Sequence, residues 1–142
     1  MEGRTALHLW IVGGLATLWN GLGAFDYLMT QTRNEAYLAK FTDPQRVHFE
    51  SFPIWMETAW ALGVWGGVAG SLLLLARSRH ASTAFAVSLA GLAGSTVYQY
   101  VLTSPPEEMK SGAMIGMNIA FWVAAIGLLV YAREMRQRGV LR

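Results

Sequence analysis

Apolar residues are gathered into four long blocks along this chain, and the charged residues are confined to the segments between them. Each block is long enough to cross a hydrocarbon layer of about 30 Å as a helix, which rises ~1.5 Å per residue. The pattern predicts an all-α membrane protein, one transmembrane domain over residues 1–142 built as a four-transmembrane-helix bundle. The predicted spans are residues 5–29, 53–76, 81–103 and 111–132.

The longest connection, residues 30–52, predicts a partly helical cap over one end of the bundle. Its charged residues alternate with aromatic and aliphatic ones, which is not typical of a disordered linker. Asn34 is placed to cap a short helix over residues 35–41. The sequence Thr42-Asp43-Pro44-Gln45 resembles a capping box that opens a second short helix. An irregular structured loop is the alternative.

The composition agrees with a membrane protein. Of the 142 residues, 54% are hydrophobic and 14% charged, whereas about a quarter are charged in soluble domains. Cysteine is absent, so the chain can form no disulfide and no thiolate metal site. The net charge of +2 comes mostly from arginines beside helix ends, which argues against a nucleic-acid partner.

Basic residues beside the predicted spans indicate how the chain is oriented. The side that holds both ends of the chain carries Arg4, Arg77, Arg79, Arg133, Arg136, Arg138 and Arg142. The opposite side carries Arg33, Lys40, Arg46 and Lys110. The positive-inside rule therefore places both termini, including a basic tail over residues 133–142, on the cytoplasmic side of the membrane.

The acids and amides within the predicted spans all fall in the outer half of the bundle, whereas the inner half is mostly aliphatic and glycine. Polar groups at membrane depth need partners inside the protein or in a water-filled recess. The pattern predicts a vestibule that opens outward, with Trp19 and Trp55 among its walls. The candidate ligand-binding residues are Asn20, Asp26, Tyr27, Glu57, Trp60, Tyr98, Gln99 and Asn118.

A second interpretation of these residues stays open. The acids could lie at the level of the lipid headgroups, and the asparagines could bond to neighbouring helices. If Asp26 and Glu57 face each other, their like charges would favour proton binding. Arg33 or Arg46 could instead neutralise them.

Glycines recur at helical spacing in the second and third spans and predict close packing between helices. They are Gly63, Gly66, Gly67, Gly70, Gly91 and Gly94. If such a face were free, it would dock another helix. The expected partners are therefore the lipid bilayer and either a second copy of the chain or a partner membrane subunit.

Known catalytic and cofactor motifs do not occur in the sequence. His8, His48 and His80 fall at different levels of the predicted bundle, so they do not form one metal or haem centre. We therefore predict no cofactor and no metal site, and we find no basis for an enzymatic function.

Four segments of the chain resemble a group of small uncharacterised bacterial inner-membrane proteins with four spans. They are residues 18–37, the sequence FPIWMETAWALGVWGGVAGSLLLL at 52–75, STVYQY at 95–100, and residues 131–142. Members of that group are sometimes labelled sugar transporters without an established activity. The leading hypothesis is binding or transport of a small polar solute or proton at the outer polar cluster. The alternative is a non-catalytic accessory or scaffold subunit of a larger membrane complex.

Overall fold

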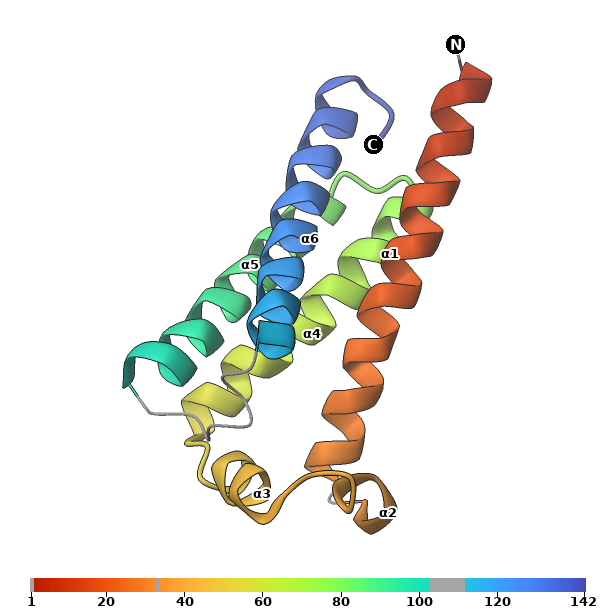
Figure 1. Ribbon diagram of the computed structural model, residues 1–142. Helices are drawn as coiled ribbons and strands as arrows, with labels where there is room; N and C mark the ends of the chain where they lie inside the picture. Colours follow the sequence, from red (N-terminus) through yellow and green to blue (C-terminus); the bar gives the residue numbers. More distant parts are fainter. Residues whose placement is uncertain (1, 33, 103–111) are drawn as a thin grey trace.

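The computed structural model describes residues 2–32, 34–102 and 112–142, and within them the chain is built of helices and turns, which confirms the predicted helical class (Figure 1). Two short helices, α2 (Glu35–Leu38) and α3 (Asp43–Glu50), lie at one end of the bundle. A π-helical turn, η1 (Tyr98–Leu102), continues α5. The long helices are α1 (Glu2–Gln31), α4 (Ile54–Leu75), α5 (Ala81–Val97) and α6 (Gly112–Gln137).

Among the described residues, three helical segments are long and apolar enough to cross a membrane. They are α4, α5 together with η1, and residues Ile115–Gln137 of α6. The helix α1 has sufficient length but carries His8, Asn20 and Asp26, which lower its hydropathy. On apolarity alone, the structure therefore supports three spans of the predicted four.

The helix ends differ from the prediction chiefly in α6, which continues to Gln137 rather than ending at residue 132. Two residues after its end lies Gly139, whose φ of 78° is favourable for glycine, and Val140 N donates to Met135 O at 2.9 Å. The predicted limits of the third and fourth spans at residues 103 and 111 lie outside the described residues.

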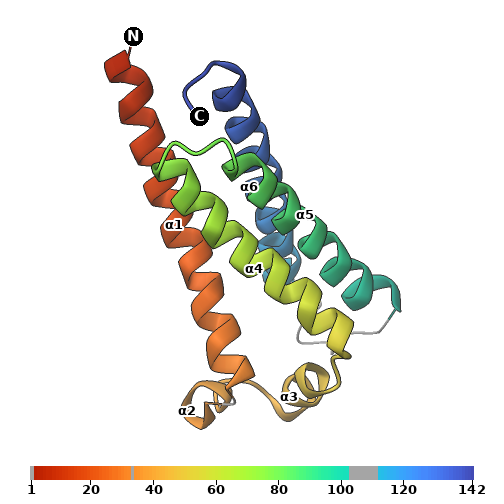
Figure 2. The ribbon, with the colours of Figure 1, turned by 180° about the vertical axis from the view of Figure 1, so that it is seen from behind.

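The helix α4 lies at the centre of the packing, with α1 along one side and α5 along the other (Figures 1 and 2). The α4–α5 contact is close because glycines let the two backbones approach. A Cβ on Gly66 would lie 3.0 Å from Ser88 N, and the Ser88 hydroxyl donates to Gly63 O at 2.6 Å. The helix α6 packs on α5.

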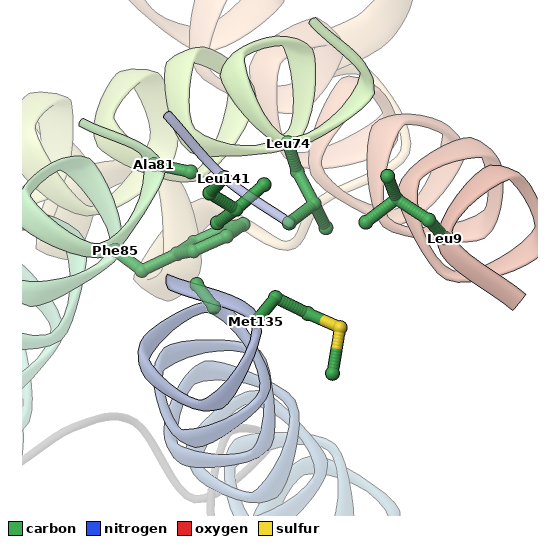
Figure 3. Packing of buried hydrophobic residues seen from close by; sticks show 7 residues of the cluster. Leu9, Leu74, Ala81, Phe85, Met135 and Leu141 are labelled. Atoms are coloured by element: carbon green, nitrogen blue, oxygen red, sulfur yellow. The ribbon is translucent and has the colours of Figure 1, made fainter. Parts of the chain in front are cut away.

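The hydrophobic core lies at the end of the bundle opposite α2 and α3. Side chains of α1, α4, α5, α6 and the segment after α6 meet there, and Figure 3 shows Phe85 beside Ala81 and Leu141. Leu141 follows α6 and returns to the α4–α5 turn, where Arg142 N donates to Arg77 O at 2.9 Å. The buried cluster consists of Leu9, Leu74, Ala81, Phe85, Ala132, Met135 and Leu141.

The two helices of the cap begin where they were predicted to begin. The Asn34 side chain accepts a hydrogen bond from Tyr37 N at 3.0 Å, so Asn34 is the N-cap of α2. Thr42 N donates to Gln45 Oε1 at 2.9 Å, and Gln45 N donates to Thr42 Oγ1 at 3.3 Å. Both predicted caps are confirmed, although α2 ends at Leu38 rather than at residue 41.

One buried histidine makes the stability of the cap depend on pH. His48 is 8% exposed and lies edge-on to Phe52, and its burial lowers its pKa from the ordinary 6.5. The unfolded chain then binds a proton more tightly than the folded chain, so the contribution of His48 is complete above pH 6.5 and is lost as the pH falls below it. We expect the thermal midpoint to decrease by a few degrees from about pH 7 to about pH 5. The variant His48→Gln should lose that decrease, and an equal decrease in the variant would assign it to other groups.

Candidate functional site

A cavity of about 230 Å³ lies between α1, α4, α5 and α6. Its lining combines acid and amide groups, hydroxyl groups and aromatic rings. The acid and amides are Asp26, Asn20, Gln99 and Asn118, the hydroxyls belong to Ser88, Ser95, Thr96 and Tyr100, and the main aromatic groups are Trp19, Trp60, Phe85 and Phe121.

The cavity exists because large side chains, rather than close backbone packing, join α1 to α6. Trp19 of α1 contacts Phe121 of α6 with ring centroids 5.5 Å apart. Nearer the core, His8 Nδ1 and the Tyr131 hydroxyl form a hydrogen bond of 2.6 Å. Both helices pack on the α4–α5 pair, so these contacts hold them apart and leave space between them.

Asp26 lies where the cap meets α1. The hydroxyl group of Tyr37 donates a hydrogen bond to Asp26 Oδ1, and the Tyr37 ring packs edge-on against Phe25 at 5.9 Å. Burial first, and then the hydrogen bond and the charge of Asp26, raise the pKa of Tyr37 above its ordinary value. Tyr37 therefore stays protonated as a donor. Because a carboxylate has two oxygens, this bond uses only part of the acceptor capacity of Asp26.

Asn20 both lines the cavity and joins two helices. Its Nδ2 donates to Ala16 O at 2.9 Å and to Ser71 Oγ of α4 at 3.2 Å. The Asn20 Oδ1 atom lies directly over Gly67, where a Cβ would overlap it. Glycine at position 67 is thus required for the approach of Asn20. The packing role and the lining role proposed for Asn20 are compatible.

Three hydroxyl groups of α5 that sequence reasoning missed also line the cavity. Ser95 donates to Gly91 O at 3.0 Å and Thr96 donates to Leu92 O at 2.8 Å, so their protons are used within the helix. Thr96 Oγ1 also accepts a bond from Trp122 Nε1 at 3.1 Å, which ties α6 to α5. The signal in the sequence was the helical spacing of Ser88, Ser95 and Gln99, which puts them on one face.

The structure brings five of the eight candidate residues to the cavity and leaves three outside. Tyr27 packs on Trp60 with ring centroids 4.9 Å apart. Tyr98 packs on Trp55 at 5.4 Å, beneath the cap. Glu57 is partly buried near the start of α4 and does not line the cavity. The five that line it are Asn20, Asp26, Trp60, Gln99 and Asn118.

The two acids therefore do not share the cavity. Among the described residues, Asp26 is the one acid in the lining, so the cavity itself does not hold the predicted pair with Glu57. Arg46, a candidate to neutralise them, forms an ion pair with Asp43 of its own helix. Arg33, the other candidate, lies outside the described residues.

The six predicted packing glycines all lie against a neighbouring helix. Gly70 lies against Phe85, and Gly94 lies against Ala59, to which a Cβ would be 3.2 Å away. Gly63, Gly66 and Gly91 pack α4 on α5. These faces are therefore occupied within the chain.

The cavity lining contains both hydrogen-bonding and aliphatic groups, and this determines what the cavity can bind. Hydrogen-bonding groups such as Asp26 and Gln99 are combined with aliphatic groups such as Ala125 and Leu128. Such a site can hold a small molecule with a polar group and an apolar body. Comparison of the chain with known protein families, with curated proteins and with solved structures finds no match.

Proposed function

We propose that this protein crosses a bacterial inner membrane four times and binds a small polar solute in the cavity between its long helices. The fourth span is α1, whose 30 residues reach about 45 Å. Its face away from α4 is apolar and exposed, which suits contact with lipid. That face includes Leu7, Trp10, Ile11, Leu15, Leu18, Leu22 and Phe25, each between 51% and 69% exposed.

The distribution of charge supports an orientation with both termini in the cytoplasm. The described arginines at the core end of the bundle belong to the start of α1, to the α4–α5 turn and to the end of α6. The positive-inside rule places that end in the cytoplasm. The cap, and the side of the cavity that Asp26 lines, then face outward.

The observation that carries the proposal is the convergence of polar side chains on one cavity at membrane depth. Asn20 and Asp26 come from α1, Gln99 from η1 and Asn118 from α6. Each such group is costly in a bilayer unless it has a partner, and ionisable groups there usually serve a function. A bound solute would add to the contacts that these groups make within the protein, such as the bond of Asp26 to Tyr37, which leaves acceptor capacity on the carboxylate.

The alternative role as a scaffold subunit has less support. It relied on glycine faces that are free to dock a partner, and the predicted glycines are packed against α1, α4 or α5. Transport remains compatible with solute binding. However, the core cluster around Leu74 and Phe85 closes the cytoplasmic end, so transport would require that end to open.

The proposal predicts which of the two acids controls ligand binding. Small molecules that co-purify with the protein would be identified by native mass spectrometry followed by extraction. Asp26→Asn should reduce ligand occupancy about tenfold or more, because a hydrogen bond to a charged group contributes ~1.5–3 kcal/mol. The asparagine amide can still accept the bond from Tyr37, so the cap should stay in place. Glu57→Gln is the matched control and should keep the ligand.

A second pair of variants tests the cavity itself. Ala125→Phe places a ring in the lining, whereas Ala90→Phe places the same ring on the exposed face of α5. We expect loss of ligand only for Ala125→Phe. An identical ligand profile in the parent protein, Asp26→Asn and Ala125→Phe would contradict solute binding at this site.

A further inference from the structure

The end of the molecule opposite the cap carries a group of three arginines brought together by backbone hydrogen bonds. The chain after α6 folds back on the turn between α4 and α5. There Arg142 N donates to Arg77 O at 2.9 Å, and Arg79 N donates to Arg142 O at 3.2 Å. Arg142 is thus held beside Arg77 and Arg79, from which it is far in sequence. We call these three residues, Arg77, Arg79 and Arg142, the arginine cluster.

The folded core anchors both segments of the arginine cluster. Leu141, next to Arg142, is 3% exposed and lies beside Leu74 and Ala81 in Figure 3. Arg77 has a φ of 57°, in a turn that Ser78 N closes by donating to Leu73 O at 2.8 Å. Because folding already orders this backbone, a ligand that binds the cluster does not have to order it.

The charge of the arginine cluster is available at the surface. The three arginines are exposed, and no acidic residue occurs in residues 76–81 or 139–142. The acid closest along the chain, Glu134, forms an ion pair of 2.6 Å with Arg138. Arginine guanidinium groups bind phosphate oxygens through paired hydrogen bonds, so the cluster suits a phosphate group.

The position of the arginine cluster distinguishes between a soluble anion and a lipid. It lies where α4 ends and α5 begins, at the end of two helices apolar enough to span a membrane. Leu72 of α4 is 52% exposed one turn before the cluster, and Val130 of α6 is 57% exposed. An anionic phospholipid has the same order of groups, with a phosphate beside acyl chains. We propose that the arginine cluster binds the headgroup of an anionic phospholipid.

The test measures lipid retained by the full-length protein in a neutral detergent, by native mass spectrometry. Dioleoyl phosphatidylglycerol should bind and dioleoyl phosphatidylcholine should not. The double variant Arg77→Gln with Arg79→Gln should weaken phosphatidylglycerol binding on the order of twentyfold, since each arginine near a membrane surface contributes about a fivefold change in affinity. Lys40→Gln with Arg46→Gln removes the same charge from the cap and should bind as the parent does.

A further variant separates a built site from diffuse positive charge. Leu141→Ala removes the anchor of Arg142 but keeps all three charges, so it should weaken phosphatidylglycerol binding severalfold. Equal binding by Leu141→Ala and the parent, or equal binding by the arginine double variant, would overturn the proposal. Competition by millimolar inorganic phosphate would also overturn it and would indicate a site for a soluble anion. The thermal midpoint of each variant without lipid shows that the fold is kept.

Discussion

Replacing Gly91 by alanine is expected to lower the free energy of unfolding by about 3 kcal/mol, the upper part of the range for overpacked cores. An alanine Cβ at this position would lie 2.5 Å from Ala59 O and 3.0 Å from Gly63 Cα, and it would overlap Gly63 N. These are backbone atoms, so no side-chain rotation can relieve the clash. The helices α4 and α5 must separate, and Ser88 would lose its hydrogen bond to Gly63 O.

The measurement is thermal unfolding in detergent followed by tryptophan fluorescence, with an expected decrease of about 10 °C. Gly127→Ala is the matched control. A Cβ at Gly127 meets nothing within 4 Å, and alanine is the better helix former. We expect the control to be neutral or slightly stabilising. Similar midpoints for the two variants would show that α4 and α5 do not approach as closely as described.

Replacing Leu74 by alanine should destabilise the protein by about 2–3 kcal/mol, because it leaves a cavity in the core cluster. Leu74 is fully buried between α1, α5 and the end of the chain, as Figure 3 shows. The expected cost is at the low end of values for soluble proteins. In a bilayer, moving an aliphatic side chain from lipid to the protein interior changes its free energy little. The destabilisation therefore comes chiefly from the lost packing contacts.

The control for this prediction lies two residues away on the same helix. Leu72 is 52% exposed and faces outward, where lipid would cover it in both the folded and the unfolded state. Leu72→Ala should change the stability by less than about 0.5 kcal/mol in detergent or lipid. If Leu72→Ala proved as costly as Leu74→Ala, the face of α4 that carries Leu72 would be packed against protein.

The candidate site shows how far spacing along a helix predicts a shared location. Asn20, Gln99 and Asn118 were expected at one depth, and the structure places them around one cavity. Depth, however, does not specify direction around the helix axis. Tyr98 and Gln99 are adjacent, yet only Gln99 lines the cavity, because η1 places the two side chains on different faces. Glu57 was also expected at this depth, but it does not line the cavity.

The sequence alone determined the features that depend on neighbours along the chain. Apolar blocks predict the long helices, and the caps at Asn34 and Thr42 act within four residues, so they could be identified without a fold. The tertiary structure alone decided which faces meet. The helices α4 and α5 have apolar residues on every side, so their hydrophobic pattern does not show which neighbouring helix each face meets. The bond from Tyr37 to Asp26 and the pairing of Arg142 with Arg77 depend on chain reversals, which local patterns do not encode.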